Sequence, residues 1–240
     1  MEGRVAFGPM KGPGPLLATG RDSDIFEYGP GLVLRRSREG NSMTMEARTM
    51  AFMRERGYPV PAVEEVSDDG FDMVMERIEG VTMVEALGKA PWTVRRQAAT
   101  LADLHRRLHD IEAPDFLPAA PVGTGTKVLH LDLHPLNVMV GPKGTFVIDW
   151  PNAHRGDPDV DVGLAWLLMA AGQIPEGGAK ARLLAFGRSL LVNAFVSHFD
   201  RHAVVPLLRQ IVEMKSRDPH MSKAEVANMW KAVAQAESRG

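Results

Sequence analysis

Apolar and polar positions divide the chain into a strand-rich part followed by a helical part. Short apolar runs separated by polar turns predict strands at residues 16–19, 25–28 and 32–36. A helix is expected from about residue 43 to 56, and the prolines that follow it predict an extended segment. A further strand is predicted at 71–78, after an Asp-Asp-Gly turn. The first third of the chain therefore favours a small sheet with one helix.

Helical spacing dominates from residue 81 onward. Apolar side chains at Ala98, Leu101, Leu104 and Leu108 recur every three or four residues, which is typical of a helix with one buried face. Prolines and glycines then predict a loop that leads to His130, and the pattern after Asp161 is helical to the end. Strands first and helices afterwards predict an α+β fold with two lobes.

Composition narrows the classes of partner and compartment. The chain has 240 residues, enough for one sizeable core or two small lobes that share a cleft. Its formal net charge of -2 predicts no nucleic acid and no anionic membrane as partner. The absence of cysteine removes disulfides, thiolate nucleophiles and cysteine-ligated zinc. Gly and Pro break up residues 1–9 and no apolar run is long enough to span a bilayer, so we expect a cytoplasmic protein without a leader.

One segment carries groups that handle protons and metal ions. Asp132 lies in the sequence His-Leu-Asp-Leu-His-Pro-Leu-Asn, which ends at Asn137, and Asp149 follows a second apolar run. Strands at 138–140 and 146–148, joined by a Gly-Pro-Lys-Gly turn, predict a hairpin that brings Asn137 and Asp149 side by side. An amide and a carboxylate oxygen there would hold Mg²⁺ on the phosphates of a nucleotide. Asp132 would orient and deprotonate an attacking hydroxyl.

These residues resemble the catalytic and metal-binding segments of the protein-kinase-like fold, most closely those of the aminoglycoside phosphotransferase and choline kinase family. The resemblance runs from about residue 17 to 166 and supports only a helical substrate-binding region after residue 170. It implies a two-lobed fold: a small antiparallel-sheet lobe that binds nucleotide at 1–78, and a larger, mainly helical catalytic and substrate-binding lobe at 79–240. The implied activity is transfer of the γ-phosphoryl group of ATP or GTP, with Mg²⁺, to a hydroxyl of a small metabolite or antibiotic.

The resemblance also implies contacts to the nucleotide phosphates. Arg35 occupies the position where the family commonly has a lysine that grips the phosphates, and Glu46 would pair with it. The neighbouring Arg36 and the rival partner Glu39 remain open. Ser23, in the turn that covers the phosphates in the family, would reach a phosphate oxygen through its hydroxyl or backbone N–H.

The segment from Met73 to Gly80 resembles the hinge between the lobes. By the resemblance, Met75 would back the adenine, the Glu76 carbonyl would accept from its amine, and the Ile78 N–H would donate to its ring.

Residues around the catalytic loop are expected to support it. His105 and His109 lie one helical turn apart, a spacing that also suits zinc, but we expect them to pack and form hydrogen bonds behind the loop. The resemblance implies that an Asp segment caps the next helix and braces the loop through main-chain bonds, a role assigned to Asp161 and less firmly to Asp157.

Two other readings and the acceptor stay open. One alternative is a nucleotide-binding pseudokinase or regulatory module without turnover; another is a metal-dependent phosphohydrolase that uses His130, Asp132 and His134. The sequence also leaves open the choice between ATP and GTP and the oligomeric state. Residues 162–240 hold ten Lys and Arg against six Asp and Glu, a net charge of +4. We therefore expect a neutral or anionic hydroxylated acceptor instead of a polycationic aminoglycoside.

Overall fold

The structure is a computed structural model that describes residues 12–20, 22–172 and 178–238. The chain forms two compact units, Met1–Gly80 with Gly141–Pro151, and Val81–Val140 with Asn152–Gly240. These units differ from the ranges 1–78 and 79–240 because an 11-residue segment late in the sequence belongs to the first unit. The nucleotide-binding and catalytic roles given to the two ranges stay predictions. Residues 1–9, where no leader was expected, and Arg21 of the predicted phosphate turn lie outside the described residues.

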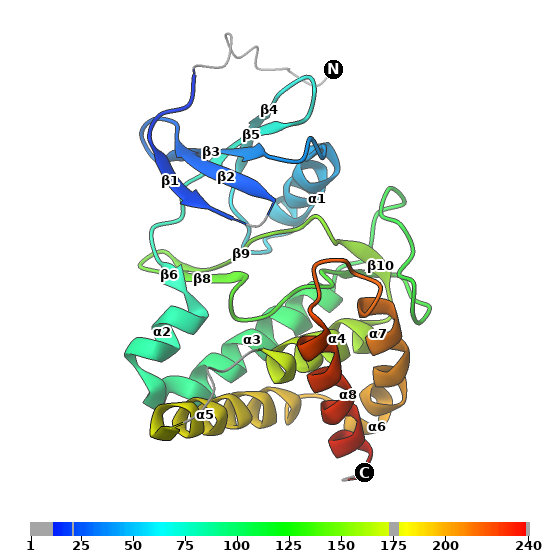
Figure 1. Cartoon of the computed structure of the whole chain (residues 1–240). Coiled ribbons are helices and arrows are strands. Elements are labelled where there is room, and N and C mark those ends of the chain that lie inside the picture. Colours follow the sequence, from blue (N-terminus) through cyan, green and yellow to red (C-terminus); the bar gives the residue numbers. More distant parts are fainter. Residues whose placement is uncertain (1–11, 21, 173–177, 239–240) are drawn as a thin grey trace. The chain divides into compact units, whose positions relative to one another are not determined.

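The first unit contains a five-stranded antiparallel sheet with strand order β1-β2-β3-β5-β4 (Figure 1). Its strands are β1 (Leu16–Thr19), β2 (Ser23–Glu27), β3 (Leu32–Ser37), β4 (Val63–Val66) and β5 (Asp72–Glu76). Four of these strands were predicted, and β2 begins two residues earlier than expected. The sequence did not reveal β4, because its two central residues are both glutamates and leave no alternating pattern.

The predicted helix is α1 (Thr44–Glu55), and it contacts β4. Its buried Met50 and Met53 join a core that includes Leu34 of β3 and Met73 of β5. The late segment is fixed to this unit by strand β9 (Gly144–Val147) and the residues after it. The Val147 N–H donates to the Pro59 carbonyl at 2.8 Å, and the buried Trp150 ring meets the Tyr58 ring edge-on at 5.7 Å. Asp149 is therefore held between two anchored neighbours.

The second unit is mainly helical, as predicted. Its helices are α2 (Met83–Lys89), α3 (Val94–His109), α4 (Pro158–Ala171), α5 (Gly178–Val196), α6 (Arg201–Val204), α7 (Leu208–Lys215) and α8 (Lys223–Glu237), with short 3₁₀ turns η1 (Pro91–Thr93) and η2 (Val205–Leu207). Two antiparallel strand pairs complete it: β6 (Val81–Thr82) with β8 (Val138–Gly141), whose last residue belongs to the first unit, and β7 (Lys127–Leu129) with β10 (His154–Gly156). The sequence predicted β8 but not the others, which are too short to show periodicity.

Local sequence explains where several helices begin. Thr82 with Glu85 and Ser222 with Glu225 form capping boxes at the starts of α2 and α8. The Asp157 side chain accepts the Asp159 N–H at 3.0 Å and so caps α4. The core between α3, α4, α5 and α7 contains buried Leu101, Leu104, Leu164, Phe195 and Ile211. Within the described ranges, no helix is long and apolar enough to cross a membrane.

Candidate nucleotide and catalytic site

Arg35 of β3 joins three side chains of the first unit. Its Nη1 lies 2.6 Å from Glu46 Oε1, its Nη2 lies 3.2 Å from Asp149 Oδ1, and its Nε donates to the Ser23 hydroxyl at 2.9 Å. The predicted ion pair between Arg35 and Glu46 is confirmed. Arg36 points to a different partner, because its guanidinium makes two bonds of 2.7 Å to Asp72.

The charges of Arg35, Glu46 and Asp149 affect one another, because the side chains are close together and those of Arg35 and Glu46 are largely buried. Burial raises the pKa of the Glu46 carboxyl, and the nearby Arg35 and the Trp150 N–H, at 3.0 Å, partly offset this. Burial lowers the pKa of Arg35, but Glu46 and Asp149 outweigh it, and the net shift is upward. The guanidinium stays charged, because arginine does not lose its proton in proteins. Arg35 is thus a fixed positive charge between two carboxylates.

Asp149 has an unusual backbone for its residue type. Its φ of 69° lies in the left-handed region, which costs free energy in a residue other than glycine. Its side chain remains 41% exposed, whereas that of Glu46 is 4% exposed. No pattern in the sequence indicated the contact between Asp149 and Arg35, because the two residues are 114 positions apart. A strained backbone that presents an accessible carboxylate is typical of a functional site.

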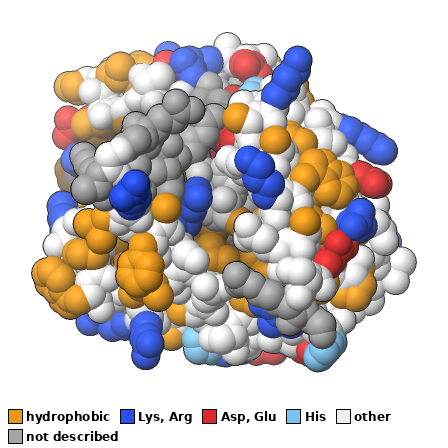
Figure 2. Space-filling view, turned by 60° about the horizontal axis from the view of Figure 1, so that its bottom comes forward, with side chains coloured by type: hydrophobic (Ala, Val, Ile, Leu, Met, Phe, Trp, Pro, Cys, Tyr) orange, Lys and Arg blue, Asp and Glu red, His pale blue; other side chains and the backbone are white. Residues whose placement is uncertain are grey.

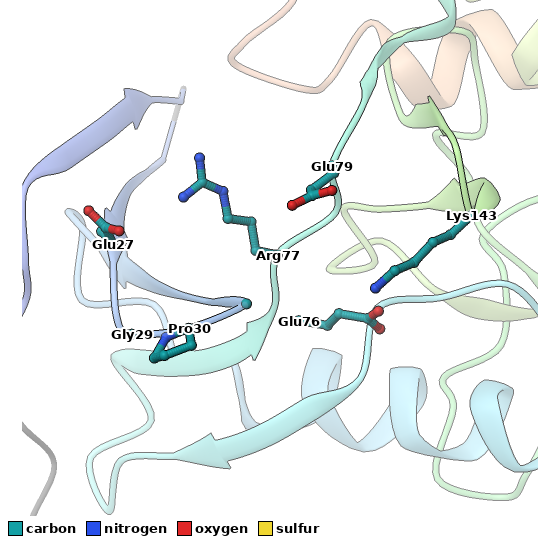
Figure 3. A pocket seen from close by; sticks show the side chains of 8 residues that line it. Glu27, Gly29, Pro30, Glu76, Arg77, Glu79 and Lys143 are labelled. Atoms are coloured by element: carbon teal, nitrogen blue, oxygen red, sulfur yellow. The ribbon is translucent and has the colours of Figure 1, made fainter.

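The hinge segment borders a pocket of about 500 Å³ within the first unit. Figure 3 shows Lys143 reaching toward Glu76, while Arg77 lies between Glu27 and Glu79. Arg35, Ile78 and Asp149 do not line this pocket, so it shares only Glu76 with the predicted nucleotide contacts. The adenine contacts predicted for the main chain of Glu76 and Ile78 stay predictions.

Asp132 is held by its neighbours in the second unit. The Asn137 amide nitrogen donates to Asp132 Oδ2 and to the Asp132 carbonyl, both at 2.9 Å. His134 Nε2 lies 3.5 Å from the other carboxylate oxygen, Asp132 Oδ1. His134 in turn accepts the Leu136 N–H on Nδ1 at 3.3 Å, which leaves the proton on Nε2. The carboxylate therefore has a fixed orientation on its loop.

Asp161 braces this loop from the first turn of α4, as the sequence predicted. It accepts the Leu131 N–H at 2.7 Å and the His130 N–H at 3.2 Å. Between these bonds the backbone takes a left-handed turn, with a φ of 54° at Leu131. Two charge-assisted bonds from these N–H groups to the buried carboxylate offset the strain of that turn. Asp157, less firmly assigned, caps the helix that carries the brace.

His105 and His109 support the loop from behind, as expected. His109 Nε2 donates to Asp161 Oδ2 at 3.1 Å. Burial by itself raises the pKa of Asp161, but the His109 bond and the surrounding histidine charges lower it well below its ordinary range. Burial lowers the pKa of His105 to about 4, and its ring packs 5.1 Å from the Phe195 ring. In the described part of the chain, no three His, Cys, Asp or Glu side chains are grouped so that they could hold a metal ion.

The donor chemistry fits Mg²⁺ at two predicted ligands. The Asn137 amide nitrogen is used by Asp132, which turns the amide oxygen, a hard ligand, away from that contact. Asp149 offers an accessible carboxylate. Asn137 belongs to the second unit and Asp149 to the first, so the juxtaposition predicted from the hairpin stays a prediction.

Comparisons with known proteins support the resemblance that the sequence indicated. The sequence model of the phosphotransferase enzyme family matches residues 116–191, which include Asp132, Asn137, Asp149 and Asp161. A choline/ethanolamine kinase family protein from Mesorhizobium loti superposes with a TM-score of 0.59 at 15% identity, over 95% of this chain and 88% of that chain. The chain has the protein-kinase-like fold. The predicted α+β class and the resemblance are therefore confirmed.

Two further solved structures show what proteins of this fold bind. The ternary complex of APH(2")-IIa with streptomycin and ATP gives a TM-score of 0.56 at 18% identity, over 88% of this chain and 92% of that chain. Amicoumacin kinase hAmiN, in complex with AMP-PNP, Ca²⁺ and its antibiotic, gives a TM-score of 0.53 at 13% identity, over 94% of this chain and 88% of that chain. No curated protein matches the sequence. Both complexes therefore combine a nucleotide with a small-molecule antibiotic, and the second also contains Ca²⁺.

Proposed function

We propose that this protein is a small-molecule kinase that transfers the γ-phosphoryl group of ATP or GTP to a hydroxyl group. The observation that carries the proposal is the environment of Asp132. Its carboxylate is oriented by Asn137 and His134 on a strained loop that Asp161 holds in place. A general base needs this fixed orientation, because proton transfer depends on geometry before acidity. The family match and the kinase neighbours support the same reaction class.

The proposed reaction moves one proton and one phosphoryl group. The acceptor hydroxyl gives its proton to the Asp132 carboxylate as its oxygen attacks the γ-phosphorus. The bond from that phosphorus to the β,γ-bridging oxygen breaks, and the nucleoside diphosphate leaves with the electron pair. Arg35 would bind phosphate oxygens, with Ser23 and Glu46 holding its guanidinium in place. Mg²⁺, which Asn137 and Asp149 would hold, supplies neutralisation of the phosphate charge.

The proposal is tested by incubating the protein with Mg²⁺ and ATP or GTP and a panel of hydroxylated metabolites and antibiotics. We expect one acceptor class to gain a phosphate, with one nucleoside diphosphate formed for each phosphate transferred. Nucleotide binding without acceptor-dependent turnover across the panel would instead support the pseudokinase alternative. Release of inorganic phosphate from phosphorylated compounds, without any nucleotide, would support the phosphohydrolase alternative.

A further inference from the structure

The first half of α5 exposes apolar side chains that a helix of a globular protein usually buries. Leu183, Leu184, Phe186 and Leu190 are 69%, 45%, 62% and 39% exposed. Leu183, Phe186 and Leu190 are spaced three and four residues apart, so they share one face of the helix. The second half of the same helix is buried through Leu191, Val192, Phe195 and Val196. The first half therefore carries an apolar face that its own unit does not cover.

Trp92 extends this face. Its side chain is 81% exposed, the most exposed large apolar side chain among the described residues. Helices α3 and α5 pack against each other, and Figure 1 shows both starting at the same end of the unit. His105 of α3 meets Phe195 of α5, and eleven residues earlier in each helix lie Val94 and Leu184. The turn η1, which carries Trp92, directly precedes α3, the helix that packs against α5.

The size of the patch is unusual for a protein surface. Figure 2 shows hydrophobic side chains at several places on this face of the molecule, including a group on its left. Trp92 and the four exposed residues of α5, with the 43% exposed Val84 of α2, together expose apolar surface on the order of 500 Å². The largest patch on a typical monomer is of that order and is often functional.

Basic side chains lie on the same elements as these apolar residues or next to them. Exposed cations on α2, the first turn of α3 and the first half of α5 are Lys89, Arg95, Arg96 and Arg182, and Arg188 is partly buried. The only acid on α2 is Glu85, and α5 contains none. A second copy of the chain, packed on the same patch, would bring these like charges together, because a two-fold interface uses the same surface twice. The charge therefore favours an anionic partner over self-association.

We propose that Trp92 and the exposed half of α5, the α5 surface, dock onto an anionic lipid bilayer. Leucine, phenylalanine and tryptophan side chains enter the boundary between headgroups and acyl chains without needing a shaped pocket, and nearby Arg and Lys contact anionic headgroups. Nucleic acid would not cover three leucines and a phenylalanine on one helix. The overall charge of -2 did not indicate this partner. At physiological salt a charge acts over about 8 Å, so the cations near the surface determine its attraction to a membrane.

Vesicle flotation tests the proposal on the intact chain. We expect binding to vesicles of phosphatidylcholine mixed with phosphatidylglycerol, weaker binding as salt is raised, and none to phosphatidylcholine alone. Brominated acyl chains should quench the fluorescence of Trp92, and the quenching should be lost in Trp92→Phe but kept in Trp230→Phe, a change on α8. No binding to the anionic vesicles, or equal binding to both kinds, would overturn the proposal.

Matched variants test the contributions of the basic and the apolar side chains separately. Arg95→Gln with Arg96→Gln should lower the partition coefficient about 25-fold, since each cation near an anionic surface contributes about five-fold. Arg54→Gln with Arg56→Gln, an exposed pair at the end of α1, should leave it unchanged. Phe186→Ala should weaken binding at every salt concentration. Vesicle binding that is unchanged both in Arg95→Gln with Arg96→Gln and in Phe186→Ala would contradict membrane docking. A wild-type dimer in sedimentation equilibrium that Phe186→Ala dissociates would also contradict it.

Discussion

At the scale of single residues, two left-handed backbones mark the functional segments. Among described residues other than glycine, only Leu131 and Asp149 have positive φ values, of 54° and 69°. Each is held by bonds from a buried carboxylate, Asp161 for the first and Glu46, through Trp150, for the second. Both carboxylates therefore act as positioning groups for a neighbouring candidate site residue.

Asp149 is expected to be required for metal-dependent nucleotide binding. Asp149→Ala should abolish binding of Mg·ATP or Mg·GTP, because the variant loses the carboxylate that we propose as a metal ligand, and should leave Mg²⁺-independent binding of the nucleoside intact. Calorimetry measures both. Asp72→Ala on β5 is the control for loss of an acidic partner of an arginine, and it should bind Mg-nucleotide normally. Unchanged Mg-nucleotide affinity in Asp149→Ala would show that the assignment is wrong.

His105 makes folding stability depend on pH. Its pKa falls from 6.5 to about 4 in the folded state, so the folded protein resists protonation at this ring. Its contribution is complete above pH 6.5 and is lost as the pH falls toward 4, a loss of about 3 kcal/mol. In urea unfolding, the free energy of unfolding should fall less steeply between pH 6.5 and 4 in His105→Leu than in the wild type. The difference in slope should correspond to about one proton. The exposed His202→Gln should not, and an equal slope in wild type and His105→Leu would refute the prediction.

At the scale of elements, the ion pair between Arg35 of β3 and Glu46 of α1 fixes the cation that we propose to bind phosphate. Arg35→Ala should raise the nucleotide KM more than Glu46→Ala, and the double variant should show less than the sum of the two effects. Arg36→Ala removes an equally short ion pair from the same strand and should barely change KM. Steady-state kinetics at saturating acceptor measure all four. Strictly additive effects on KM would show that Arg35 and Glu46 do not act as a pair. A larger effect of Arg36→Ala than of Arg35→Ala would assign the phosphate contact to Arg36.

The sequence predicted elements well where the apolar pattern was long. Helices α1 and α3 and strand β3 show clear periodicity, and the spacing of the Asp132 motif identified the loop that Asp161 braces. Three-residue strands such as β7 and β10 carry no period, and their position depends on pairing with a distant segment. The contact of Arg35 with Asp149 was likewise invisible, because only the folded backbone brings together residues 114 positions apart.

At the scale of the whole molecule, charge bears on the acceptor. Of the ten basic residues after position 161, three lie on α5, and Glu176 lies outside the described residues. Residues 197–240 still hold seven basic against five acidic side chains. A polycationic acceptor needs a carboxylate-rich wall, so we expect weak or absent phosphorylation of kanamycin-like compounds and better turnover of neutral or anionic ones. Efficient, salt-sensitive turnover of an aminoglycoside would contradict this and would point to Asp157 and Asp159 as wall residues.

The most direct test of the account is acceptor phosphorylation by Asp132→Asn beside the wild type, with labelled γ-phosphate and an acceptor found in the panel. A general base acts mainly in the transition state, so turnover should fall about 10²–10⁴-fold while nucleotide affinity stays near that of the wild type. Asp103→Asn, an exposed change on α3, should keep full activity. Wild-type turnover by Asp132→Asn would contradict the account, because no other described residue has been assigned to accept the proton.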